Sequence, residues 1–273
     1  MYKIKLFGVS GRIGVGKDEL SKMVRYILEN SGDDYLEYLR CKKLADDIFD
    51  YELKKYAAKL KQIVSILIGC TIEQLEDRVF KEAPLPGWNR FKVRVQTVCG
   101  DKNFYFSSKN DALNEMQLGG KLFGLNYGLI LEETLSPRQL MQIIGTDSGR
   151  DLIHPDIWCK SLFSDFKENS NWIINDLRYS TNEASYIREH NGIIIGVKRL
   201  FKLRYPDYAH LEDDRYPYKI PISLVYENPE LYEKLTFESE EVMGDLDWAD
   251  YVIENNGTLE ELYDKVKNLL INL

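Results

Sequence analysis

The order of apolar and polar positions near the start of the chain predicts a strand, a turn and a helix. Residues 2–11 alternate and then become apolar, as in a strand that enters a buried sheet. Beyond a glycine-rich turn, apolar residues recur at helical spacing in the segment 17–30. The residues that line this predicted helix face are Leu20, Met23, Val24, Ile27 and Leu28.

Strand and helix patterns continue to alternate through the rest of the chain. Residues 51–56 predict a short strand that runs into a helix, 171–176 and 193–199 predict buried strands, and 248–257 predicts the last strand. An amphipathic helix follows, with Thr258 as its cap. This alternation predicts an α/β fold of three layers, in which helices cover both faces of a mostly parallel five-stranded sheet.

Two segments interrupt this alternation within an expected single domain of residues 1–273. The pattern from Phe91 to Phe106 has period two around CGDKN, which predicts a hairpin within a β-rich insertion at about 88–134. Residues 200–247 are rich in Tyr, Pro and Asp and are expected to form a lid-like insertion. A helix restarts at Pro137, a residue suited to a first helical turn.

Composition narrows the class of protein. A net charge of −8 argues against binding of a nucleic-acid backbone. No apolar run approaches the roughly 18 residues of a membrane helix. The first strand starts with no signal peptide before it, so we expect a cytoplasmic protein, in the host cytoplasm if a phage encodes it. The cysteines form no C-x-x-C pair and the histidines lack ligand spacing, so a zinc or histidine metal centre is not expected.

The turn GRIGVGKDEL at 11–20 is the main candidate site. It meets the phosphate-loop pattern G-x-x-x-x-G-K but has Asp18 where that pattern requires a hydroxyl. Glycines let backbone N–H groups converge on phosphate oxygens, and a helix N-terminus and a lysine add positive charge. The alternative is a glycine-rich turn with an ordinary surface lysine. The residues expected to bind ATP are Gly11, Arg12, Gly14, Val15, Gly16, Lys17 and Asp18.

Asp176 ends a buried strand, where open α/β sheets place their ligands. An acid at this place in phosphate-loop enzymes holds magnesium, so Asp18 and Asp176 are the expected Mg²⁺ ligands. The alternative for Asp176 is a helix cap. Leu177 stands where hydrolytic ATPases often carry a glutamate, and the GTPase pattern N-K-x-D is absent. We therefore expect transfer of phosphate to another substrate and not to water.

Several cations stand beside strand ends or glycine turns, as phosphoryl transfer requires, because its catalysis depends on positioning and on charge neutralisation. Each of them taken alone is more often a surface residue than a ligand, and only their shared placement favours a site. These cations are Arg138, Arg150, Arg178, Lys198 and Arg199.

The segments at 137–160, 175–187 and 193–199, with the ending at 250–270, resemble the bacteriophage deoxynucleoside monophosphate kinases. That family commonly has G-K-D in its loop, so the resemblance implies that Asp18 is a family trait. Threonine often follows there, whereas this chain has Glu19, and Ser10 and Ser21 are the nearest hydroxyls. Residues 88–134 and 200–235 lie outside the resemblance. Phe237 stands where a histidine is expected, which leaves the role of that segment open.

The resemblance implies a fold like that of the nucleoside monophosphate kinases, and transfer of the γ-phosphate of ATP, with Mg²⁺, to a (deoxy)nucleoside 5′-monophosphate. The alternatives are another small-molecule kinase, of the dephospho-coenzyme A or phosphomevalonate type, and a non-catalytic nucleotide-binding protein. Neither nucleic acid nor membrane is an expected partner, and a homodimer is left open. Expected catalytic residues are Lys17, Arg150, Arg178 and Arg199; expected substrate contacts are Lys61, Arg138, Gln142, Thr146, Arg150 and Arg178, with Lys81 as a further phosphate candidate.

Overall fold

A computed structural model describes residues 4–12, 14–30, 34–42, 49–97, 100–123, 126–199 and 246–273. Its chain forms two units: unit 1 contains residues 1–58 and 158–273, and unit 2 contains residues 59–157. All but two residues of the lid-like segment predicted at 200–247, and Phe237 with it, lie outside the described residues. The prediction of a single domain with two insertions stays a prediction.

Unit 1 is built on a five-stranded sheet of order β2-β6-β1-β7-β8. β1 (Leu6–Ser10) is central, between β6 (Trp172–Leu177) and β7 (Ile193–Lys198), and β2 (Glu52–Lys54) and β8 (Tyr251–Glu254) form the edges. Each neighbouring pair is parallel, which confirms the predicted fold class. Because later strands lie on both sides of β1, its carboxyl end is a topological switch point, where open α/β sheets bind ligands.

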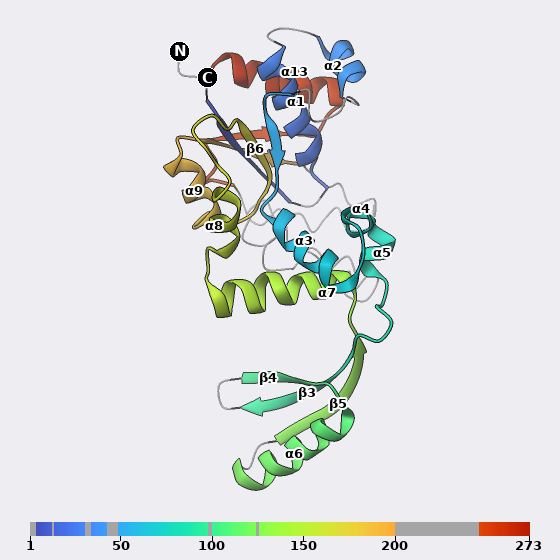
Figure 1. Ribbon diagram of the computed structural model, residues 1–273. Helices are drawn as coiled ribbons and strands as arrows, with labels where there is room; N and C mark the ends of the chain where they lie inside the picture. Colours follow the sequence, from blue (N-terminus) through green and yellow to red (C-terminus); the bar gives the residue numbers. More distant parts are fainter. Residues whose placement is uncertain are drawn as a thin grey trace, which may run out of the picture. The chain divides into compact units, whose positions relative to one another are not determined.

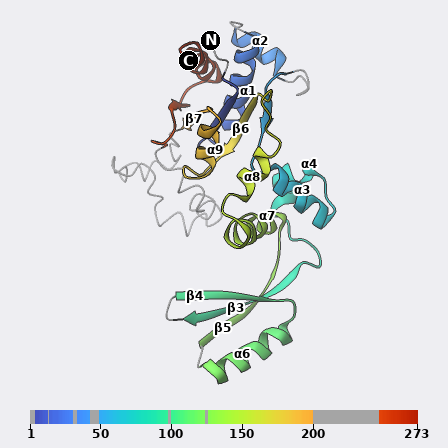
Figure 2. The same ribbon diagram turned by 60° about the vertical axis from the view of Figure 1, so that its left-hand side comes forward.

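Helices cover both faces of this sheet (Figures 1 and 2). One layer contains α1 (Lys17–Glu29) and α13 (Leu259–Ile271), and the other contains α8 (Ile157–Phe163) and α9 (Glu183–Glu189). Thr258 caps α13 in a capping box with Glu261, as its place in the sequence predicts. The predicted three-layer arrangement is therefore confirmed.

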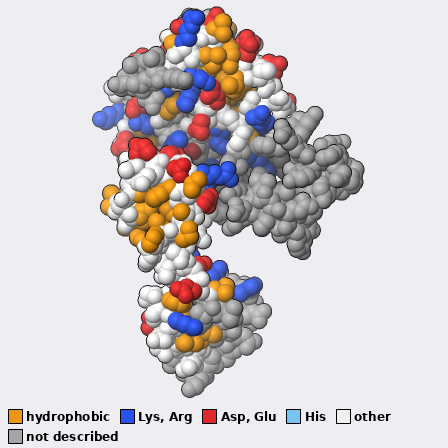
Figure 3. All heavy atoms as spheres, turned by 90° about the vertical axis from the view of Figure 1, so that its right-hand side faces the viewer, with side chains coloured by type: hydrophobic (Ala, Val, Ile, Leu, Met, Phe, Trp, Pro, Cys, Tyr) orange, Lys and Arg blue, Asp and Glu red, His pale blue; other side chains and the backbone are white. Residues whose placement is uncertain are grey.

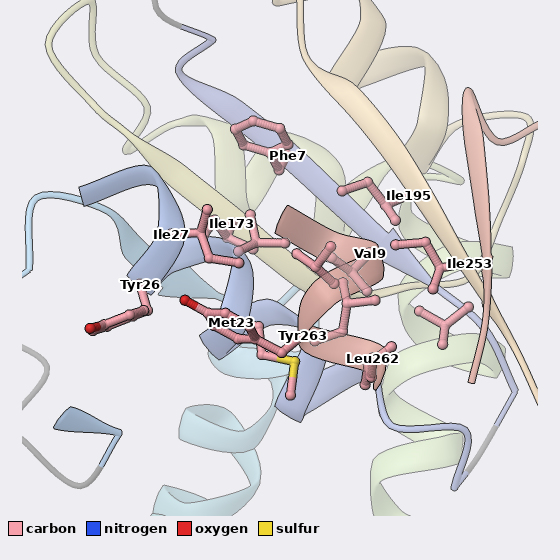
Figure 4. Packing of buried hydrophobic residues seen from close by; sticks show 14 of the residues in the cluster. Phe7, Val9, Met23, Tyr26, Ile27, Ile173, Ile195, Ile253, Leu262 and Tyr263 are labelled. Carbon is pink, nitrogen blue, oxygen red and sulfur yellow. The ribbon is translucent and has the colours of Figure 1, made fainter. Parts of the chain in front are cut away.

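The core between the sheet and the α1–α13 layer is apolar (Figure 4). Phe7 and Val9 are on the strand that leads into the glycine-rich turn, and both are fully buried. Met23 of α1 and Leu262 of α13 pack in the same cluster. Burial of this kind stabilises the fold by about 25 cal/mol per Å² of apolar surface. The end of β1 is thus held by a packed core.

A short helix, α2 (Tyr35–Cys41), adds tyrosines to the edge of this cluster. Tyr38 is fully buried and its ring lies 5.5 Å from the rings of both Tyr26 and Tyr263. Burial, and then the charge of Glu19, raise the pKa of the Tyr38 hydroxyl well above its usual value. The hydroxyl accordingly stays protonated and donates a hydrogen bond to Glu19 at 2.9 Å.

Unit 2 contains a group of helices around a second apolar cluster that includes Val64, Leu75 and Leu140. Ile66 and Val79 of this group are exposed apolar residues. Figure 3 shows apolar side chains on one face of the molecule. The elements are α3 (Ala57–Ile68), which starts with two residues of unit 1, then α4 (Ile72–Glu76), α5 (Arg78–Glu82), α7 (Pro137–Gln142) and the π-helix η2 (Ile143–Ile153).

The remainder of unit 2 is a three-stranded antiparallel sheet of order β4-β3-β5. β3 (Asn89–Thr97) pairs with β4 (Gly100–Phe106) in the register Phe91↔Phe106, which confirms the predicted hairpin. β5 (Asn126–Thr134) lies on the other side of β3, and α6 (Lys109–Phe123) packs on the sheet through Ala112. The helix α6 was not predicted, because its apolar positions form only a short stripe.

Candidate active site

The glycine-rich turn follows the carboxyl end of β1 and leads into α1. Gly16 is the N-cap of α1 with φ 100°, and Gly11 has φ 151°, both in the region that favours glycine. A Cβ on Gly11 would lie 2.4 Å from the carbonyl oxygen of Val197 on β7, and one on Gly16 would lie 2.6 Å from Nδ2 of Asn255. The loop is therefore packed so closely against β7 and the end of β8 that its glycines cannot be replaced without a shift.

Lys17 is the first residue of α1 and lies over the loop that precedes it. Its Nζ donates hydrogen bonds to the carbonyl oxygens of Gly11 and Arg12, the second at 2.8 Å. The ammonium group is thus held within the loop, at the helix N-terminus, where the helix dipole also favours an anion. This arrangement concentrates positive charge where a phosphate group would need it.

Asn255 follows β8 and ties the loop to the opposite edge of the sheet. Its Nδ2 donates to the carbonyl oxygen of Val15 at 2.8 Å, and its backbone N–H donates to Lys198 at 2.7 Å. Only 6% of Asn255 is exposed. One side chain therefore fixes the position of the loop relative to the ends of β7 and β8. Asn255 was not among the predicted site residues, although the polar ENNG sequence after the last strand was a signal for it.

Asp18, the residue that replaces the usual hydroxyl, contacts β6. Nδ2 of Asn175 donates to Oδ1 of Asp18 at 2.8 Å. The other carboxylate oxygen has no hydrogen bond within the described residues. In the same ranges, no three His, Cys, Asp or Glu side chains gather into a group able to hold a metal. A nucleotide-bound Mg²⁺ needs only one or two carboxylates besides phosphate oxygens and water, so Asp18 fits that role.

Asp176 lies one residue further along β6 and engages a different partner. Its Oδ1 accepts the backbone N–H of Tyr56 at 2.7 Å, and its Oδ2 accepts that of Ala57 at 3.0 Å. These are N–H groups at the start of α3, which have no acceptor inside the helix. Asp176 therefore caps α3. A metal contact of Asp176, which the sequence suggested, stays a prediction.

Arg178 follows β6 and is held by a buried acid. The backbone N–H groups of Arg178 and Tyr179 donate to Oε2 of Glu183, at 2.7 and 3.2 Å. Glu183 is only 1% exposed, while Arg178 is exposed. Glu183 also accepts the hydroxyl hydrogen of Tyr56 through its backbone carbonyl, and burial raises the pKa of that tyrosine. The main chain under Arg178 is thus fixed while its side chain extends outward.

Glu19 and the two serines nearest the loop all form hydrogen bonds with other parts of the protein. Glu19 does not replace the missing hydroxyl, because it accepts hydrogen bonds from Tyr38 and from Lys42, the latter at 3.0 Å. Ser10 is buried and donates to Leu177 at 2.9 Å. Ser21 donates to the carbonyl oxygen of Lys17 at 2.8 Å. The two nearest hydroxyl hydrogens therefore already have acceptors inside the protein.

In unit 2, three cations gather around α3, α5 and α7. Lys61 forms an ion pair with Glu76, and Arg138 forms one with Glu82 at 2.6 Å. Burial, and then the charge of Lys61, lower the pKa of Lys81, to which Arg138 also contributes. Two carboxylates thus only partly balance the positive charge of Lys61, Lys81 and Arg138. This group is suited to bind an anion.

The other predicted substrate contacts are Gln142, the last residue of α7, and Thr146 and Arg150 of η2. All three are half-buried. Gly145 lets η2 approach α3, since a Cβ there would lie 2.9 Å from Leu60. π-helical turns often occur at functional sites.

The last two predicted cations are in unit 1. Lys198 is the last residue of β7, and Arg199, which follows it, is exposed.

The loop anchor gives a direct prediction for nucleotide binding. Asn255→Ala removes one hydrogen bond to the loop, so we expect weaker binding of Mg-ATP by about two- to thirteenfold, from roughly 0.5–1.5 kcal/mol per hydrogen bond. Isothermal titration calorimetry would measure it. Asn256→Ala, the same change at the exposed neighbour, is the control and should leave the affinity unchanged. Equal affinities of both variants and the parent protein would contradict the anchoring role.

Comparison with known proteins identifies similar enzymes. The family model described as deoxynucleotide monophosphate kinase matches residues 94–212. This range contains Arg150, Asp176 and Arg178, and it runs through most of the segment 88–134, which corrects the expectation that this segment lies outside the resemblance. A deoxynucleoside-5′-monophosphate kinase of Escherichia phage T5 is 26% identical over 204 residues, which cover 69% of this chain and 73% of that enzyme. The chain is therefore similar to the deoxynucleotide monophosphate kinases, as its motifs predicted.

Proposed function

We propose that this chain transfers the γ-phosphate of ATP to a (deoxy)nucleoside 5′-monophosphate and so produces the diphosphate. The observation that carries the proposal is the loop at 11–18, a glycine turn between the central strand and a helix, with Lys17 over it. The similarity to a phage deoxynucleoside-5′-monophosphate kinase supports the same reaction. An oxygen of the acceptor phosphate attacks the γ-phosphorus, and ADP leaves.

The donor side of the reaction relies on the loop. Backbone N–H groups at the start of α1 and the ammonium group of Lys17 would bind the phosphates, and Lys17 would exchange its loop carbonyls for phosphate oxygens. Such fixed donors stabilise the transition state because they need no rearrangement as charge moves to the leaving group. Mg²⁺ would be held through Asp18 and would neutralise phosphate charge. Asp176 is the second candidate ligand of this cation.

The acceptor side relies on arginines and on the cations of unit 2. Arg150, Arg178 and Arg199 would bind phosphate groups in the transition state, since guanidinium groups match phosphate oxygens in a bidentate way. Lys61, Arg138, Gln142 and Thr146 would bind the acceptor. A nucleoside monophosphate is already an anion at neutral pH, so the reaction requires no strong general base.

Two other functions compete with this proposal. A kinase for dephospho-coenzyme A or phosphomevalonate would use the same donor loop and a different acceptor. A non-catalytic nucleotide-binding protein would retain the loop without turnover. Product formation separates the kinases from the binding protein, and the acceptor separates the kinases from one another.

The experiment that tests the proposal is a panel of acceptors. Purified protein with Mg-ATP and each ribo- or deoxynucleoside monophosphate in turn should give diphosphate from at least one acceptor. Lys17→Ala should reduce that rate by about 10²–10³-fold, as loss of one preorganised donor does. Lys22→Ala, on the same helix, is the matched control and should retain it. Binding of ATP without any diphosphate product would favour the binding protein, and dephospho-coenzyme A or phosphomevalonate as the only acceptor would favour the rival kinase.

Arginine geometry gives a separate prediction. Arg150→Lys and Arg178→Lys keep the charge but lose the planar fork, so at least one should lower kcat/KM for the acceptor by about 10–100-fold, from roughly 1.5–3 kcal/mol per charge-assisted hydrogen bond. Affinity for ATP should be largely preserved. Arg40→Lys, which changes an exposed arginine paired with Glu37 on α2, serves as the control. Steady-state kinetics that vary ATP and acceptor separately would measure this, and unchanged parameters in both variants would remove these arginines from the site.

A further inference from the structure

Asn175 is a buried polar residue of β6 that the predicted site does not contain. It lies between Ile174 and Asp176, and only 4% of it is exposed. Its Nδ2 donates to Oδ1 of Asp18 at 2.8 Å, so its amide group is directly beside the residue that replaces the usual loop hydroxyl. A buried asparagine at the end of a central strand, in contact with the candidate phosphate loop, requires an explanation.

The oxygen of this amide group has no partner among the described residues. Oδ1 of Asn175 is buried and accepts no hydrogen bond from them. Buried polar atoms in native proteins are nearly always hydrogen-bonded, and an exception suggests a bound ion or water. Exchanging the positions of Oδ1 and Nδ2 would not satisfy the oxygen. It would place Oδ1 against the carboxylate of Asp18, and a carboxylate accepts hydrogen bonds and therefore needs the NH₂ group opposite it. Asn175 thus places an unsatisfied oxygen next to a carboxylate.

Asp18 supplies a second oxygen of the same kind. Its Oδ1 is engaged by Asn175, and its Oδ2 has no hydrogen bond to the described residues. The two side chains are in contact, and each has an oxygen that can only accept, so a cation or a water molecule that a cation orients would stabilise them. Carboxylate and amide oxygens are the ligand types that magnesium and manganese prefer. The pair therefore has the chemistry of a divalent-cation site at the first turn of α1.

We propose that Oδ1 of Asn175 and Oδ2 of Asp18 together hold the divalent cation that accompanies the nucleotide, or one of its water ligands. This inference rests on the proposed kinase function. It assigns the role of the second Mg²⁺ ligand to Asn175 in place of Asp176. Successive side chains of a strand point to opposite faces, and Asp176 already caps α3 with both carboxylate oxygens.

The proposal is tested with Mn²⁺ as the probe, in the complex of the protein with ADP. Electron paramagnetic resonance would measure the Mn²⁺ affinity, and calorimetry without metal would measure the ADP affinity. Asn175→Leu removes the oxygen but keeps the branched shape of the side chain, so Mn²⁺ affinity should fall by about 10–100-fold, as for loss of other groups around a metal. The ADP affinity without metal should stay within about threefold. Asn171→Leu, the same change just before β6, is the control.

Asn175→Asp separates an oxygen ligand from a structural hydrogen bond. It keeps an oxygen and adds charge but loses the donor to Asp18, so we expect Mn²⁺ to bind at least as tightly as in the parent protein. An equal loss of Mn²⁺ affinity in the Leu and Asp variants would overturn the proposal, as would an unchanged affinity in the Leu variant. If the Leu variant does not fold, a weakened affinity in the Asp variant alone overturns it. Failure of the parent protein to bind ADP would instead contradict the proposed function.

Discussion

The close contact between the glycine loop and the ends of β7 and β8 is the constraint on which the candidate site depends. Gly11 lies so near the carbonyl oxygen of Val197 that no side chain fits between them. Asn255 then holds Val15 from the other edge of the sheet. Val15 also packs in the core beneath β1, with Phe7 and Val9, so apolar contacts hold this part of the loop as well. A loop with fixed N–H directions can bind phosphates without an ordering cost at the moment of binding.

Successive side chains of β6 point to opposite faces of the sheet, so its two polar residues contact different elements. Asn175 contacts Asp18 at the first turn of α1, and Asp176 caps the start of α3. Glu183 then fixes the backbone beneath Arg178 just beyond the strand. A single strand end thus connects the loop, the start of α3 and an exposed arginine.

Much of the fold of unit 1 follows from local patterns in the sequence. The apolar strand before the glycines, the helix period after them and the cap at Thr258 depend on neighbouring residues only, and each is found where it was predicted. The hairpin of β3 and β4 also follows from its period of two. The helix α6 and the π-helical form of η2 were not predicted, because a weak apolar stripe and a change in helical hydrogen bonding leave little trace in the sequence.

The least predictable parts of the site are contacts between residues that are distant in sequence. Asn175 meets Asp18 and Asn255 meets Val15 only because parallel strands bring their carboxyl ends to one edge of the sheet. The acid in the GKD sequence was recognisable as a variant of the usual loop, but its buried amide partner was not. A strand residue such as Asn175, between apolar and acidic neighbours, looks like an ordinary polar end of a strand until its partner is known.

Hydrogen exchange, followed by mass spectrometry on peptides that span 10–20 with and without Mg-ADP, tests most directly whether this loop binds nucleotide phosphates. Phosphates that accept hydrogen bonds from the amide groups of the loop and of the first turn of α1 should slow exchange there. Peptides from β3 and β4 should exchange at the same rate in both states. Unchanged exchange in the loop at a saturating Mg-ADP concentration would contradict the account.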